Sequence, residues 1–170
     1  MRPWSANPRW VTAFDDFPLD SVVVKGGLFA RAADEAWTIV LSHEREHPVG
    51  RLVRDWGAEG WADGEREVLP GVSVVPTGGH SAGHQAIVVR GTGAGARTLA
   101  FFGDLCMRPW SANPRWVTSF DDFPLDSVEA KASLFARAAD EGWLVALSHE
   151  VRTPVGRLVR DRDRYRFEAV

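Results

Sequence analysis

The first 55 residues of this chain are a near copy of residues 107–161. The two stretches align at a constant offset of 106 residues without a gap, and 43 of the 55 positions are identical. Solenoid repeats are shorter, about 20–45 residues, and vary more between units. The chain therefore carries one folding segment twice. We expect two parts, a duplicated loop–helix–strand segment (1–55) and a second region (56–170) that contains the source copy.

The second copy predicts a helix followed by a strand. Residues 121–126 combine acidic residues with proline, which is typical of a helix start. Apolar residues then recur at helical spacing from Val128 to Ala139, and Gly142 supplies a helix end. The short apolar run 143–148 predicts a strand that leads to His149.

The first copy has the same plan but a weaker helix. Gly26 and Gly27 replace Ala132 and Ser133, and each glycine inside a helix costs roughly 0.5–1 kcal/mol relative to alanine. Two explanations remain open. The copies occupy different environments, or the first helix packs against a partner and tolerates a poorer sequence.

The remaining pattern predicts further strands and an α/β fold. Alternating or apolar runs bounded by glycine and proline are typical of strands and hairpins. They occur at 68–76, interrupted by Pro70-Gly71, at 85–90, at 98–102, and in a closing hairpin at 156–160 and 165–170.

Three of the predicted strands lead to residue types that bind metals. His80 and His84 lie in a glycine-rich turn after the first of them, Asp104 follows the strand at 98–102, and His149 follows the strand at 143–148. Imidazole and carboxylate ligands suit zinc, manganese or iron, and a catalytic zinc has about three protein ligands plus a water. His80, Asp104 and His149 therefore form a candidate metal site.

The ordered set Thr77-Gly78-Gly79-His80-Ser81-Ala82-Gly83-His84-Gln85, Phe102-Gly103-Asp104 and Ser148-His149 resembles the C-terminal half of the metallo-β-lactamase superfamily. That superfamily includes lactonases, hydroxyacylglutathione hydrolases and phosphoesterases. The resemblance covers residues 56–170, and residues 1–55 through the copy. It implies a metallo-β-lactamase-like αββα half-sandwich.

The resemblance also implies roles for individual residues. His80 would ligate one metal, Asp104 would bridge two, and His149 would ligate the second, with His80 and Asp104 as the catalytic pair. His84 would belong to the same cluster, with a role behind the ligands or in packing more than as a direct metal ligand. The implied cofactor is Zn2+, or Mn2+ or Fe2+, with one or two ions per site. Gly78 stands where the superfamily commonly has proline.

The sequence departs from the superfamily in one major respect. The His-x-His-x-Asp-His motif, which supplies most ligands from the N-terminal half, does not occur in it. A conventional dinuclear site would then not form within one chain. We expect a homodimer that completes the sandwich in trans. In one form of this dimer, the two protomers exchange the duplicated segment. His43, the counterpart of His149, would add a ligand from the same or the other chain, and His47 would be a surface residue.

These expectations define a function and its rivals. The leading hypothesis is a promiscuous metal-dependent hydrolase of phosphodiesters or phosphotriesters that uses a metal-activated water. The alternatives are a lactone or ester hydrolase, a non-catalytic rearranged fragment that only folds and dimerises, and a duplicated scaffold in which the copy restores packing. Metal content separates the first two from the others.

Composition limits the partners and the compartment. A net charge of −3 gives no electrostatic reason to expect nucleic acid or an anionic membrane, so the expected partners are a small-molecule substrate and a second copy. No apolar run reaches the length of a membrane span. Cys106 is the single cysteine, which excludes an intrachain disulfide and fits a reducing compartment. We expect a cytoplasmic protein.

Overall fold

The structure of the protein is a computed structural model that describes residues 18–40, 49–51, 57–59 and 64–170. The chain divides into two compact units, Met1–Trp61 and Ala62–Val170. The division lies six residues beyond the end of the first copy. The predictions for His43 and His47 fall outside the described residues.

The larger unit is a seven-stranded sheet with one long helix. The strands lie in the order β10-β9-β8-β7-β6-β5-β4. The elements are β4 (Arg66–Leu69), β5 (Val72–Pro76), β6 (Gln85–Arg90), β7 (Thr98–Phe101), the 3-10 turns η2 (Gly103–Leu105) and η3 (Pro109–Ala112), α2 (Pro124–Asp140), β8 (Leu144–Ala146), β9 (Val155–Asp161) and β10 (Arg164–Ala169).

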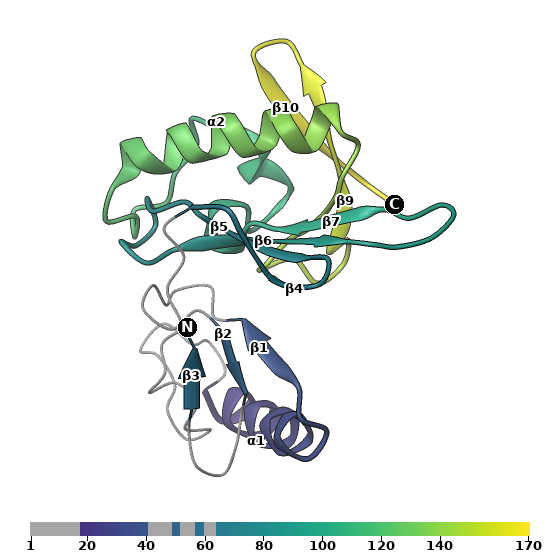
Figure 1. Ribbon diagram of the computed structural model, residues 1–170. Helices are drawn as coiled ribbons and strands as arrows, with labels where there is room; N and C mark the ends of the chain where they lie inside the picture. Colours follow the sequence, from purple (N-terminus) through teal and green to yellow (C-terminus); the bar gives the residue numbers. More distant parts are fainter. Residues whose placement is uncertain (1–17, 41–48, 52–56, 60–63) are drawn as a thin grey trace. The chain divides into compact units, whose positions relative to one another are not determined.

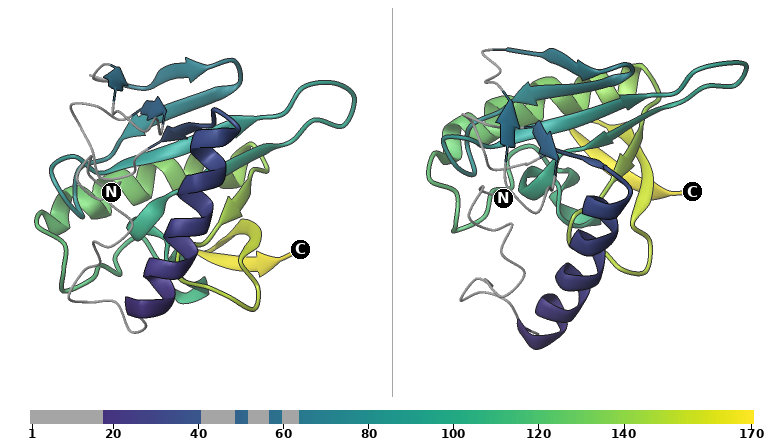
Figure 2. Two further views of the ribbon diagram at one scale, coloured as in Figure 1. Left: turned by 90° about the horizontal axis from the view of Figure 1, so that it is seen from below. Right: turned by 60° about the horizontal axis from the view of Figure 1, so that its bottom comes forward.

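Most strand pairs in this sheet are antiparallel, as hairpin connections require. β7 and β8 pair in parallel, and the chain passes through α2 between them. Figures 1 and 2 show α2 lying along one face of the sheet. The predicted strands and the predicted helix are confirmed in kind and position, and Gly142 follows the helix with a φ of 67°.

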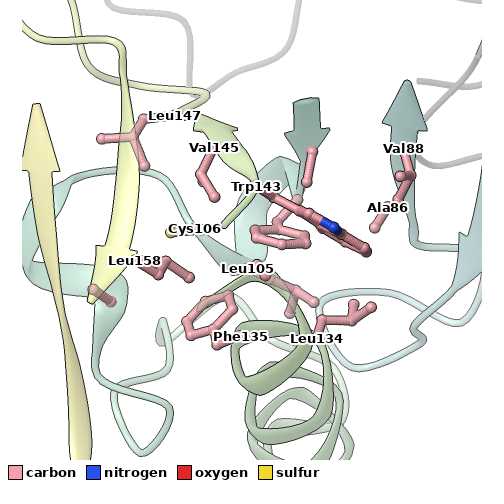
Figure 3. Close-up of a cluster of buried hydrophobic side chains, with 14 residues drawn as sticks. Ala86, Val88, Leu105, Cys106, Leu134, Phe135, Trp143, Val145, Leu147 and Leu158 are labelled. Carbon is pink, nitrogen blue, oxygen red and sulfur yellow. The ribbon is translucent and has the colours of Figure 1, made fainter. Parts of the chain in front are cut away.

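The core of the larger unit lies between α2 and the sheet. Leu134, Phe135 and Ala138 of the helix meet Trp143 and inward-facing strand residues such as Val145, all of them at most 6% exposed (Figure 3). Burial of such aromatic and aliphatic side chains is the main stabilising contribution available to the unit. The helix is therefore fixed on the sheet by its apolar face.

The opposite face of the sheet is also apolar. Residues that alternate with the buried ones, and pair across the strands, are Ile87, Val89, Leu99, Phe101, Leu144 and Ala146. Val89 is 39% exposed, and the other five are half-buried. A sheet that is apolar on both faces is typical of the middle of a layered fold. The larger unit has the character of half a sandwich, while dimerisation stays a prediction.

The smaller unit repeats the end of the larger one. It contains α1 (Pro18–Asp34), β1 (Thr38–Val40), β2 (Val49–Arg51) and β3 (Gly57–Glu59), with an antiparallel sheet in the order β1-β2-β3. Ile39 pairs with Gly50, as Val145 pairs with Gly156. The duplicated sequence therefore folds the same way twice, in the same strand register.

Within the described ranges, neither α1 nor α2 is long and apolar enough to span a membrane.

Candidate metal centre

Three strand ends converge on one edge of the larger sheet. β5 and β7 run in the same direction because each is antiparallel to β6, which lies between them, and β8 is parallel to β7. Parallel strands deliver their C-terminal ends to the same edge. The residues that follow these ends are His80, Asp104 and His149.

The Asp104 carboxylate lies between the two imidazoles. His80 Nε2 is 3.3 Å from Asp104 Oδ2, and His149 Nε2 is 3.1 Å from Asp104 Oδ1. The side chains of His80 and Asp104 are 18% and 21% exposed, whereas that of His149 is 56% exposed. The cluster is thus open to solvent on the His149 side, where a substrate could approach.

His84 lies behind this cluster and is 1% exposed. Its Nε2 accepts a hydrogen bond from the Asp104 backbone N–H at 3.3 Å, so the ring proton is on Nδ1, which lies 2.5 Å from Thr77 Oγ1. Gly103, with a φ of +54°, lets the chain pass close to the ring, since a Cβ there would be 2.7 Å from His84 Nε2. With both nitrogens engaged by protein groups, His84 positions the Asp104 turn, which favours the role behind the ligands over a direct metal bond.

Sequence reasoning missed a second carboxylate beside His80. Asp121 Oδ1 lies 3.0 Å from His80 Nδ1 and accepts a 2.7 Å hydrogen bond from Thr118 Oγ1. The Asp121 side chain is 3% exposed. Burial raises the pKa of this carboxyl, but its hydrogen bonds, including those with Thr118 and His80, outweigh burial and hold the pKa below its ordinary value. Asp121 therefore stays ionised and fixes the imidazole with Nε2 facing Asp104.

The chain offers no local signal for that contact. Asp121 is 41 residues from His80 in sequence, and its neighbours predicted only a helix start. Ser148 is a second contributor of this kind, because its hydroxyl donates to the Gly103 carbonyl at 3.0 Å and joins the end of β8 to the turn after β7. The Asp121 contact depends on the position of the loop before α2, and the Ser148 contact depends on the parallel pairing of β7 and β8.

Cys106 follows the η2 turn but does not join the cluster. The thiol is fully buried, and burial raises its pKa to about 12. A thiol that remains protonated at neutral pH is a poor metal ligand. Cys106 belongs to the hydrophobic core.

The donor atoms around Asp104 have the spacing of metal ligands. In a tetrahedral site with bonds of about 2.05 Å, neighbouring ligand atoms lie about 3.3 Å apart. The two nitrogen–oxygen separations at Asp104, 3.3 and 3.1 Å, match that spacing. No group of three or more His, Cys, Asp or Glu side chains among the described residues is arranged to hold one ion. In the part of the chain that the structure describes, each Asp104 oxygen thus faces one imidazole at this spacing.

Comparison with known proteins places the fold. No family model matches this sequence. No curated protein matches it either. Among solved structures, a probable metal-dependent hydrolase from Staphylococcus aureus is 23% identical with a TM-score of 0.52, over 63% of this chain and 39% of its own.

Two further solved structures agree with this result. The hydrolase AbOPH of the beta lactamase superfamily is 22% identical with a TM-score of 0.53, over 61% of this chain and 36% of its own. AidC, a dizinc quorum-quenching lactonase solved with a product, is 14% identical with a TM-score of 0.55, over 64% of this chain and 37% of its own. The protein has a partial metallo-β-lactamase-like fold, and it spans under two fifths of the length of these hydrolases.

Proposed function

We propose that the protein is a metal-dependent hydrolase that cleaves phosphodiesters or phosphotriesters. The observation that supports this most is the Asp104 carboxylate held between His80 and His149 at separations that suit metal ligands. His80 and His149 would each hold an ion through Nε2, and Asp104 would contact both. Zn2+, Mn2+ or Fe2+ fits these nitrogen and oxygen donors.

The residues around the ligands have separate tasks in this proposal. What the reaction would gain from a bound metal is a hydroxide at neutral pH and a polarised substrate oxygen. Asp121 holds His80 in one orientation, and His84 fixes the backbone of Asp104. The exposed side of His149 leaves room for a small-molecule substrate.

We further propose that a second copy of the chain completes the site. Among the described residues, each imidazole–carboxylate pair supplies two protein ligands, whereas a catalytic zinc has about three. The second apolar face of the sheet, on which Val89 is 39% exposed, favours packing against another sheet. A homodimer would cover that face and bring further ligands, with His43 as the sequence counterpart of His149.

A lactone or ester is the second candidate substrate class. The likeness to AidC, described as a lactonase, favours it at the level of fold. Parallel assays with a phosphotriester and an N-acyl-homoserine lactone would distinguish the two classes. Hydrolysis of the lactone alone would overturn the phosphoester proposal and retain the metal site.

Metal content per chain is the decisive measurement. We expect about one or two transition-metal ions per purified chain by elemental mass spectrometry, and loss of most of them in His80→Ala. His47→Ala, a histidine predicted at the surface, is the matched control and should keep the parent content. A parent protein without metal above background would reject the hydrolase and favour a non-catalytic folded fragment.

A further inference from the structure

The two copies of the duplicated segment agree contact by contact. Trp37 Nε1 donates to Glu35 at 2.7 Å, and Trp143 Nε1 donates to Glu141 at 2.9 Å. The Arg31 guanidinium pairs with Glu35 at 3.2 Å, as its counterpart does with Glu141 at 3.1 Å. The backbone N–H groups of both tryptophans also close the helix in the same way, at 2.8 and 2.9 Å. The first copy therefore presents the same surface as the second.

The differences between the copies avoid the side that packs on the sheet. Of the twelve positions that differ, Val145 alone is buried in the second copy, and its counterpart is the similar Ile39. The other side chains that fix α2 on the sheet are unchanged in the first copy. They are Leu134, Phe135, Ala138 and Trp143, which correspond to Leu28, Phe29, Ala32 and Trp37.

This shared surface is less covered in the first copy. Leu28 is 46% exposed, whereas Leu134 is 6% exposed. Phe29 is half-buried, whereas Phe135 is fully buried. The edge of β1 that corresponds to the β7-facing edge of β8 has no strand beside it among the described residues. The same protein contains a matching surface for it, formed by β7 and the core around Phe102.

We infer that α1, β1 and β2 of one chain take the place of α2, β8 and β9 on the sheet of another chain. β1 would pair with β7 as β8 does, with Ile39 opposite Ala100. The resident segment holds this place in the parent because it follows directly from Cys106, which gives it a high effective concentration. Exchange therefore becomes visible when the resident segment is weakened.

Chain length favours exchange between chains over exchange within one. In the exchanged state, β3 would lie where β10 lies, because both pair with the preceding strand in corresponding registers. β10 and β4 are separated by six strand spacings, about 29 Å at about 4.8 Å each. The chain from Glu59 to Arg66 reaches at most about 24 Å at about 3.4 Å per residue. With β3 docked in that place, this reach favours an occupant from a second copy.

A matched set of phenylalanine variants tests the inference. Phe135→Asp should keep a cooperatively folding larger unit, because the first copy replaces the weakened segment. Phe29→Asp alone should resemble the parent, and Phe29→Asp/Phe135→Asp should lose the folding transition. Phe135→Ala, a milder change, is compared with Phe29→Ala/Phe135→Ala in the same way. Equal loss of folding in the single Phe135 variants and the double variants would overturn the inference.

Cross-linking between chains identifies the origin of the occupant. All chains carry Cys106→Ala and Phe135→Asp, one population adds Ile39→Cys, and the other adds Ala100→Cys. After mixing and mild oxidation, we expect at least tenfold more mixed disulfide than with Val23→Cys in place of Ile39→Cys, since Val23 is 74% exposed on the helix and has no β7 contact to make. Equal yields from the two cysteine positions, or disulfide only when both cysteines are in one chain, would overturn exchange in trans.

Discussion

Asp121 acts on the candidate site through one atom of His80. The carboxylate holds Nδ1, so that Nε2 faces Asp104. Outer carboxylates of this kind orient metal-binding histidines, and their loss typically costs 10–100-fold in metal affinity. We expect Asp121→Asn to weaken metal binding by about that factor, measured by competition with a chromogenic chelator.

The adjacent residue provides the control for this prediction. Asp122 is exposed, and Asp122→Asn should bind metal as the parent does. A thermal melt of both variants shows whether folding is kept. Unchanged metal affinity in a folded Asp121→Asn protein would remove Asp121 from the site.

Lys131 is a buried charged residue of α2. It is 1% exposed, and its ammonium donates to the Trp116 carbonyl. Burial lowers the pKa of Lys131 from 10.5 to about 8, while the negative charge of Asp121 opposes the shift. Cys106 moves the other way, because burial raises its pKa from 9.0 to about 12.

These shifts predict how stability depends on pH. Between pH 8 and 10.5 the unfolded chain keeps the Lys131 proton and the folded chain loses it, so stability rises with pH. Above pH 9 the unfolded chain loses the Cys106 proton and the folded chain keeps it, so this contribution falls and offsets the rise. The parent should gain about 1 kcal/mol between pH 8 and 9, then level off.

Urea unfolding at a series of pH values checks this prediction. Lys131→Met should remove the rise between pH 8 and 9. Cys106→Ala should let it continue to pH 10.5, to about 3 kcal/mol in total. A parent and a Lys131→Met variant with the same pH profile would show that Lys131 does not lose its charge in the folded state.

At the scale of elements, the two helices end differently. Gly142 ends α2 with a φ of 67°, and its counterpart Ala36 takes a φ of 52° after α1. A side chain in this left-handed region costs roughly 1 kcal/mol relative to glycine. We expect Ala36→Gly to stabilise the smaller unit by about 1 kcal/mol, seen as about fivefold slower hydrogen exchange at the Trp37 amide.

The reverse substitution is the matched control. A Cβ at Gly142 would meet no atom within 4 Å, so Gly142→Ala carries the conformational cost without a clash. It should speed exchange at the Trp143 amide, which donates to Ala138 O, about fivefold. An Ala36→Gly protein with unchanged exchange would mean that the Ala36 backbone is not held in this conformation.

The elements with clear boundary signals were predictable from the sequence. Glycine and proline mark the turn at Pro70-Gly71 and the loop at 91–97, and strands begin and end there as expected. The 3-10 turns η2 and η3 were not predicted, since segments of three or four residues have no periodicity. Ser111 stabilises η3 because its hydroxyl accepts a hydrogen bond from the Arg108 backbone N–H at 2.9 Å. This local contact has no sequence pattern from which it could be predicted.

The site was predictable only in part, for a related reason. His80, Asp104 and His149 each follow an apolar run, so strand ends alone bring them together. The orienting contacts from Asp121 and Ser148 depend on the position of the loop before α2 and on the parallel pairing of β7 and β8. Sequence spacing does not contain that information.

At the scale of the whole molecule, the second apolar face of the sheet leads to a separate prediction about the proposed dimer. Val89 lies on that face, pairs with Leu99 and is 39% exposed, so a lysine can be placed there without entering the core. A buried lysine at an interface without a partner is strongly unfavourable. We expect Val89→Lys to shift the protein in sedimentation velocity from two chains to one of 18.8 kDa.

Metal content then connects that interface with the site. If a second copy supplies the missing ligands, monomeric Val89→Lys should lose most of its bound metal although His80, Asp104 and His149 are intact. Val151→Lys is the control, because Val151 is 91% exposed and lies outside the sheet, and it should keep both mass and metal. A monomeric Val89→Lys protein that retains its metal would place every ligand within one chain.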